Sequence, residues 1–305
     1  EADVLAARAA ERAQQALELH QQLYSQVPPP ADPAQRKQFE EQKAQQEASF
    51  HKVLAFGAWR KKDYDTAARE YAILLGHTPD DAWINYQLGL ASLQKSSPEY
   101  RPGFWHVARA VALNIPKSGD VREYLLKTVG AYQGVLPGCL TRQVDGMIAR
   151  AKENPRPPAD WRVIPAEQVN AVRQDLSVKR IFDDLKAGGE SGDVIWLASC
   201  GMEFPELAGE VIDTTENTDN VVTLRVAAGQ EAVDAKLANV EVKVVAPPEA
   251  KNLKAGDIIR FSGILTDYAN EPQFLVKLTD GKVNPEDIPQ ATPSPARRRG
   301  GRAGR

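Results

Sequence analysis

The sequence predicts an α+β protein in which an α-helical solenoid precedes a small five-stranded β-barrel. Three observations support this prediction. Helix-forming residues at helical spacing dominate the first half of the chain, and a two-residue pattern recurs after 34 residues within it. From about residue 207 the sequence pattern changes to short runs of β-branched residues separated by turn residues. No apolar run approaches the roughly 18 residues of a membrane-spanning helix, so we expect no membrane span.

The 305 residues are too many for one core of ordinary size. The helix predicted over residues 2–26 ends at Pro28, Pro29 and Pro30, and Asp32 caps the next helix at Pro33. Prolines between residues 155 and 165 mark a domain boundary. We expect five segments: an N-terminal helical extension (1–48), helical repeats (49–153), a linker with short helices (154–206), a small β-barrel (207–287) and a disordered basic tail (288–305).

The prediction of helical repeats is based on the spacing of two small residues. Leu54-Ala55 and Leu88-Gly89 lie 34 residues apart, and each small residue is expected where two helices cross. The stretch from Lys62 to Ala67, followed by Tyr71, Leu74 and Pro79, resembles a tetratricopeptide repeat. The second repeat has a lengthened turn before a helix predicted over 103–113. A third helical pair, over about 119–132 and 140–153, is either a degenerate repeat or a capping pair.

Five runs predict the strands of the barrel. They are Val211-Ile212, 221–226, 240–245, 257–265 and 274–278, with a short insert at 248–254 after the third run. Gly263 is expected at a bulge or tight bend that helps to close the barrel. This pattern resembles an OB-like barrel. The glycine-rich segment 188–192 is predicted to be a flexible connecting turn.

The combination resembles exported bacterial proteins of unknown function that join tetratricopeptide helices to a small β-barrel. That resemblance implies no catalytic residue. The chain begins at Glu1 without an apolar signal segment. We interpret it as a mature periplasmic or extracellular protein after signal removal, with a shortened, cytoplasmic chain as the alternative.

The residues with reactive side chains do not form the patterns that catalysis needs. No glycine-rich phosphate loop or nucleophile elbow is present. The four histidines, His20, His51, His77 and His106, lack metal-ligand spacing. Cys139 and Cys200 are flanked by glycine or apolar residues, and the sequence leaves open whether they pair. We therefore predict that the protein is not an enzyme and uses no cofactor or metal.

A binding groove is the remaining candidate site. In the tetratricopeptide resemblance, the first helix of each repeat lines a concave groove, which implies a role for eight residues here. They are Lys52, Phe56, Trp59 and Arg60 from the first repeat and Trp83, Tyr86, Leu90 and Gln94 from the second. Aromatic rings beside cationic groups suit a peptide or a carbohydrate, although Phe56, Leu90 and one tryptophan would pack between helices under the alternative interpretation.

Charge is divided unevenly along the chain. Residues 201–290 hold 16 acidic and 8 basic groups, whereas residues 291–305 hold five arginines and no acid: Arg297, Arg298, Arg299, Arg302 and Arg305. An acidic barrel is a poor match for a phosphate backbone, which argues against nucleic acid as a partner. We predict a non-enzymatic scaffold that binds a protein or copies of itself and is able to form filaments. The alternative is a nucleic-acid- or carbohydrate-binding protein that uses the barrel, the groove and the arginine-rich tail.

Overall fold

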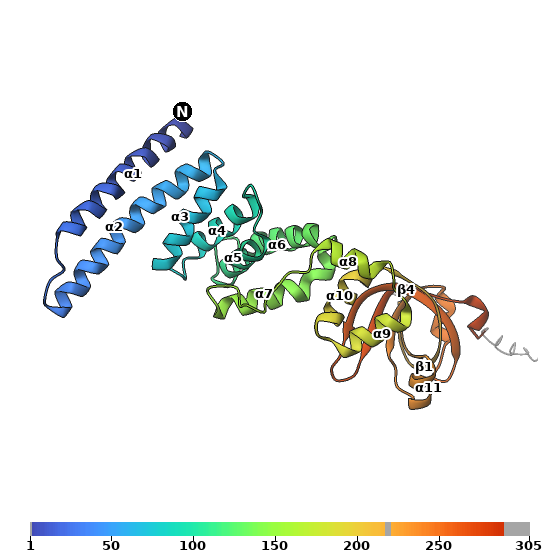
Figure 1. Cartoon of the computed structure of the whole chain (residues 1–305). Helices are drawn as coiled ribbons and strands as arrows, with labels where there is room; N and C mark the ends of the chain where they lie inside the picture. Colours follow the sequence, from blue (N-terminus) through green and yellow to red (C-terminus); the bar gives the residue numbers. More distant parts are fainter. Residues whose placement is uncertain (1, 217–220, 290–305) are drawn as a thin grey trace, which may run out of the picture. The chain divides into compact units, whose positions relative to one another are not determined.

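The computed structural model describes residues 2–216 and 221–289. The chain divides into two compact units, Glu1–Ala166 and Glu167–Arg305. Helices occupy the first unit, and a closed five-stranded barrel follows in the second, which confirms the predicted α+β class (Figure 1). Residues 290–305 of the predicted basic tail and the turn residues 217–220 lie outside the described residues. The tail was predicted to begin at residue 288, but Ile288 is buried in the barrel core. Within the described ranges, no helix has the length and apolar character to cross a membrane.

The first unit is a series of helices, each packed on the next. Its elements are α1 (Ala2–Gln26), α2 (Pro33–Arg60), α3 (Tyr64–His77), α4 (Ala82–Gln94), α5 (Tyr100–Ala112), α6 (Ser118–Gln133), the 3₁₀ helix η1 (Pro137–Leu140) and α7 (Thr141–Glu153). Contacts join α1 to α2, α2 to α3, α3 to α4 and α4 to α5, and α5 then packs on both α6 and α7. The long helices α1 and α2 run side by side (Figure 1).

Aspartates begin three of these helices. The carboxylates of Asp32, Asp63 and Asp81 each accept a hydrogen bond from the backbone N–H three residues later, at 2.9, 3.1 and 2.9 Å. A side-chain oxygen in this position satisfies one of the N–H groups that have no partner at a helix start. The N-cap predicted at Asp32 is confirmed, and the same chemistry fixes the starts of α3 and α4.

Small residues allow the helices to approach closely. Ala55 of α2 and Ala67 of α3 are both fully buried in one apolar cluster. Gly89 of α4 lies against α5, where an added Cβ would stand 2.8 Å from the backbone nitrogen of Val107. The two positions separated by 34 residues are therefore both buried in the helical packing.

The second unit begins with three short helices, α8 (Ala166–Arg173), α9 (Val178–Ala187) and α10 (Gly189–Ser199). The expectation of a flexible connector at 188–192 is wrong, because Gly189 starts α10. Gly188, at φ 68°, ends α9 and begins the next helix. An added Cβ at Gly192 would meet the Asp184 carbonyl oxygen at 3.0 Å, so this glycine lets α10 pack closely on α9.

The barrel strands are β1 (Glu203–Glu216), β2 (Val222–Ala228), β3 (Val240–Ala246), β4 (Ile258–Ala269) and β5 (Leu275–Val283). They close in the order β1-β2-β3-β5-β4, and the β3–β5 pair is parallel. The helix α11 (Gln230–Ala235) joins β2 to β3, the 3₁₀ helix η2 (Pro248–Asn252) joins β3 to β4, and η3 (Pro285–Asp287) follows β5. This topology is compatible with the OB-like barrel expected from the sequence.

The barrel core combines strand residues with residues from the flanking helices. Ile181 and Leu185 of α9, Ile195 of α10 and Ala250 of η2 belong to the same buried cluster as the inward side chains of the strands. The bulge predicted at Gly263 is confirmed by a shift in the β4–β5 register between Ser262 and Ile264.

Candidate functional site

The surface of α2 carries four of the predicted groove residues. Lys52, Phe56 and Arg60 are exposed, and the Phe56 ring keeps 54% of its accessible surface. Trp59 is half-buried, because its ring packs edge-on against Tyr64 at 5.2 Å between centroids. Arg60 is engaged elsewhere, since its guanidinium lies 2.6 Å from the Asp3 carboxylate of α1. Of this group, Lys52 and Phe56 have the side chains most available to a partner.

The surface of α4 carries the other four as a single stripe. Trp83, Tyr86, Leu90 and Gln94 are separated by three, four and four residues, which places them on one side of the helix. The opposite side, from Ile84 to Ser92, is buried. Trp83 is 56% exposed, and its ring lies 5.9 Å from that of Tyr86.

A tyrosine of α6 adjoins this stripe. The pKa of Tyr86 is raised, chiefly by burial and further by the neighbouring hydroxyl of Tyr124. The sequence analysis missed Tyr124, because the third helical pair showed too weak a repeat to fix its register. Trp83 and Tyr86 are therefore ring neighbours on α4, and Tyr124 of α6 interacts electrostatically with Tyr86. Among the described side chains, no hydrogen bond, ion pair or ring contact links this group to the one on α2.

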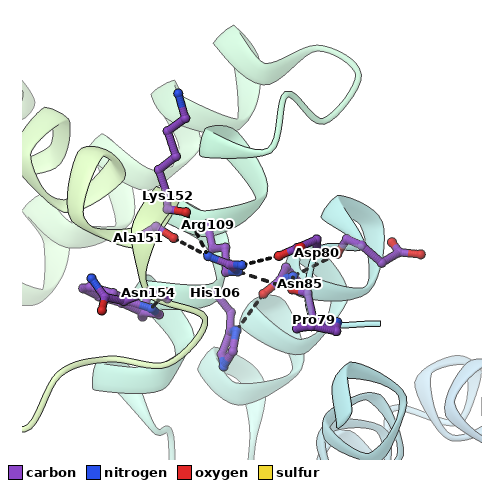
Figure 2. Close-up of polar contacts among 10 residues, drawn as sticks. Pro79, Asp80, Asn85, His106, Arg109, Ala151, Lys152 and Asn154 are labelled. Carbon is purple, nitrogen blue, oxygen red and sulfur yellow. Dashed lines mark hydrogen bonds and ion pairs between the residues drawn. The ribbon is translucent and has the colours of Figure 1, made fainter. Parts of the chain in front are cut away.

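Buried polar contacts hold α4 in place (Figure 2). The Asn85 side-chain amide donates to the carbonyls of Pro79 and Asp81, at 3.0 and 2.9 Å. Its oxygen lies 2.9 Å from Nδ1 of His106 on α5. Because the Asn85 oxygen can only accept, His106 carries its proton on Nδ1. These bonds tie the turn before α4 and the buried side of α4 to α5.

His106 is neutral at physiological pH. Burial, with the nearby charges of Arg109 and Arg156, lowers the pKa of His106 to about 4. A neutral, hydrogen-bonded imidazole in a packed interior is a structural group, not a proton donor available to a substrate.

Arg109 extends the same network to α7 (Figure 2). Its side chain is only 4% exposed and lies 2.5 Å from the Asp80 carboxylate. It also donates to the carbonyls of Ala151 and Pro79, at 2.6 and 3.3 Å. A buried guanidinium needs such partners, since an unpaired one carries a large desolvation cost. The network therefore fixes the orientation of the helix that presents Trp83.

Two of the remaining histidines link neighbouring helices. His51 lies 2.7 Å from Glu70, and His20 lies 2.9 Å from Gln46, each joining two adjacent helices. Across the described residues, no three histidine, cysteine, aspartate or glutamate side chains are grouped to hold a metal ion. Neither cysteine is a free thiol.

The aromatic residues of the barrel are mostly enclosed. Phe261 and Tyr268, two aromatic residues of β4, are 1% and 8% exposed and belong to the barrel core. Phe274 is half-buried against the same core. The five tail arginines named in the sequence analysis lie outside the described residues.

No protein-family model matches the chain, and comparisons with curated proteins and with solved structures return no significant match.

Proposed function

We propose that this protein is a non-enzymatic scaffold whose helical unit binds another protein through the outer surfaces of α2 and α4. The exposure of Phe56 and Trp83 carries this proposal. The same unit fully buries two other large aromatic side chains, Phe104 and Trp105, so it has the capacity to enclose rings. Exposed aromatic residues on a rigid helix offer a large contact area at low entropic cost, which is typical of binding hot spots.

The arrangement of the helices supports a tetratricopeptide-like repeat as the basis of this surface. Three consecutive helical pairs, α2–α3, α4–α5 and α6–α7, follow the extension formed by α1. Ala55 and Gly89 are buried at corresponding places in the first helices of two pairs. In such an array the first helices present neighbouring surfaces, which agrees with the proximity of Tyr86 on α4 to Tyr124 on α6.

Export and self-association form part of the same proposal. The absence of a free thiol at Cys139 and Cys200 fits an oxidising compartment such as the periplasm or the extracellular space. The acidic residues 201–290 and the arginines beyond residue 291 have complementary charge, which would orient neighbouring copies. Nucleic-acid binding is the weaker proposal, because Phe261 and Tyr268 are buried and offer bases no ring to stack on.

Site-specific photo-crosslinking in the producing cells tests the scaffold proposal. A photoreactive phenylalanine analogue at position 56 or 83 should capture a partner protein, which mass spectrometry then identifies. The same analogue at Leu136, an exposed residue of this unit outside both surfaces, is the matched control.

The captured partner is then purified and titrated calorimetrically against the intact chain. The double variant Phe56→Ala, Trp83→Ala should bind it at least about tenfold more weakly, as expected for removal of two hot-spot rings. Leu136→Ala should bind it as the parent does. Equal affinity of the double variant and the parent would refute the assignment of the binding surface to α2 and α4.

A further inference from the structure

The first helix, α1, carries an exposed and mostly apolar row of residues beside the surface that packs on α2. Ala6, Ala13, Leu17 and His20 of α1 are buried, and contacts join this helix to α2. The exposed row, which we call the α1 stripe, has alternating steps of four and three residues and consists of Leu5, Ala9, Arg12, Ala16, Leu19 and Leu23. Its three leucines keep 59%, 66% and 60% of their accessible surface.

The spacing of the α1 stripe is that of a seam between two helices. Steps of four and three residues keep side chains on one side of a helix and match the a and d positions of a heptad repeat. From Leu5 to Leu23 the stripe is about 27 Å long, since a helix rises by about 1.5 Å per residue. The helix α1 is the first of its unit and lies beside α2 (Figure 1). The stripe is therefore long enough to pack against a further helix.

The α1 stripe is complementary to a second copy of itself that runs in the opposite direction. Read backwards, the stripe has the same order of steps, so each of its positions meets another position of the stripe. Leu5 then faces Leu23, Ala9 faces Leu19, and Arg12 faces Ala16. Each alanine is opposite a larger side chain, as close packing requires. In a parallel pair, alanine would face alanine and Arg12 would face the same arginine of the other copy.

The charges of α1 favour the same antiparallel orientation. Asp3 already pairs with Arg60 of α2, at 2.6 Å. The other charged residues of α1 are Arg8, Glu11 and Arg12 in the first half and Glu18 in the second half. Two arginines and one glutamate give the first half one net positive charge, and the single glutamate gives the second half one negative charge. An antiparallel pair places these opposite charges side by side, whereas a parallel pair aligns like charges.

Other occupants match the α1 stripe less well. A helix that lies on a membrane surface has a polar side rich in lysine or arginine, whereas α1 holds two arginines and three acidic residues. The chain's own residues 291–305 include no large apolar side chain that could cover the leucines. A second α1 supplies both the leucines and the matching charges.

We propose that two copies of this chain form a symmetric dimer through antiparallel packing of their α1 stripes, with the two-fold axis between Arg12 and Ala16. Such an interface uses the same surface of both copies and closes on itself. Six leucines, each covering on the order of 100 Å², together with the alanines and the arginine stems, bury on the order of 1,000 Å², which is typical of a weak, reversible interface. The expected dissociation constant is therefore micromolar. The dimer does not use the surfaces of α2 and α4, and it gives the self-association proposed above an apolar contact.

Sedimentation equilibrium of the intact chain, from about 1 to about 200 μM, tests the dimer. At about 0.5 M salt, where charges are screened beyond about 4 Å, the chain should still dimerise, because the contact is mainly apolar. Leu19→Lys should weaken the dimer at least about tenfold, since it places a charge in the seam. Gln21→Lys is the matched control, because it adds the same charge at an exposed position on the opposite side of α1. It should dimerise as the parent does.

Far-UV circular dichroism should be the same for the parent and both variants, because each change is at an exposed position. A parent that stays monomeric over this range, or a Leu19→Lys variant that dimerises as well as the parent, would overturn the proposal. The double variant Phe56→Ala, Trp83→Ala should dimerise as the parent does, so this result and the test of partner binding are decided separately.

Cross-linking tests the orientation of the two helices. Neither native cysteine is a free thiol, so Leu5→Cys and Leu23→Cys each add one reactive thiol. Oxidising a mixture of these two variants should mainly join position 5 of one copy to position 23 of the other, as mass spectrometry would show. Preferential joining of like positions would indicate a parallel pair and overturn the antiparallel dimer. Flotation with phosphatidylglycerol vesicles covers the remaining occupant: vesicle binding by a monomeric parent that Leu19→Lys abolishes would assign the stripe to a lipid surface and overturn the proposal.

Discussion

Substituting Gly89 by alanine tests the packing of α4 on α5, which fixes the proposed binding surface. The new Cβ would lie 2.6 Å from the Val107 side chain, 2.8 Å from the Val107 nitrogen and 2.9 Å from the Gly103 carbonyl oxygen. Ordinary van der Waals contact begins near 3.4 Å, and two of these neighbours are backbone atoms that cannot rotate away. The two helices would therefore have to separate by about half an ångström.

The size of the effect follows from two opposing terms. Overpacking of this kind costs about 1 to 3 kcal/mol, and the rigid backbone neighbours favour the upper end. Replacing glycine by alanine in a helix raises the free energy of unfolding by about 1 kcal/mol, because alanine has the higher helix propensity. We expect Gly89→Ala to lower the free energy of unfolding by about 2 kcal/mol, and Gly89→Leu to lower it further.

Gly146→Ala is the matched control. Gly146 lies in the middle of α7, and an added Cβ there meets nothing within 4 Å. This variant should be more stable than the parent by up to about 1 kcal/mol, because only the propensity term applies. Urea unfolding followed by far-UV circular dichroism measures both variants. If Gly89→Ala is as stable as Gly146→Ala, the close approach of α4 and α5 is refuted.

Three further predictions concern His106, the cysteines and the tail. Because the folded-state pKa of His106 is about 4 and its ordinary value is 6.5, its contribution to stability is complete above pH 6.5 and is lost as the pH falls toward 4. Urea unfolding should show about 2 to 3 kcal/mol less stability at pH 4.5 than at pH 7.5 from this group, and His106→Gln should reduce that difference; an unchanged difference would contradict the assignment. Maleimide should label neither Cys139 nor Cys200 in the native chain until a reductant is added, as mass spectrometry would show. Deleting residues 291–305 should shorten or weaken assemblies at low salt without unfolding the chain, because the tail's charge is screened beyond about 8 Å at physiological ionic strength; light scattering that is identical for both chains would exclude this role.

The helices and strands were largely predictable because local signals mark them. Asp32 before Pro33 fixes the start of α2, and β-branched runs mark the five strands. The spacing of Ala55 and Gly89 gave the right positions for close packing, since only a small side chain fits where two helices touch. Gly57, which meets Ala10 of α1 in the same way, was not singled out, because the partner lies far away in sequence.

The start of α10 was not predictable from local preference. Because glycine has a low helix propensity, the segment from Gly188 to Gly192 was predicted to be a turn. Tertiary packing decides otherwise, because Val194, Ile195 and neighbouring apolar residues are buried and Gly192 allows close contact with α9.

A helix uses its backbone N–H and C=O groups internally, so α2 and α4 recognise a partner only through side chains such as those of Phe56 and Trp83. Both residues are more than half exposed, so their rings contribute little to the packing of the helices. We therefore expect the double variant Phe56→Ala, Trp83→Ala to lose its partner while its far-UV circular dichroism matches that of the parent. A loss of helical signal together with the loss of binding would show that the two rings support the fold and do not recognise a partner.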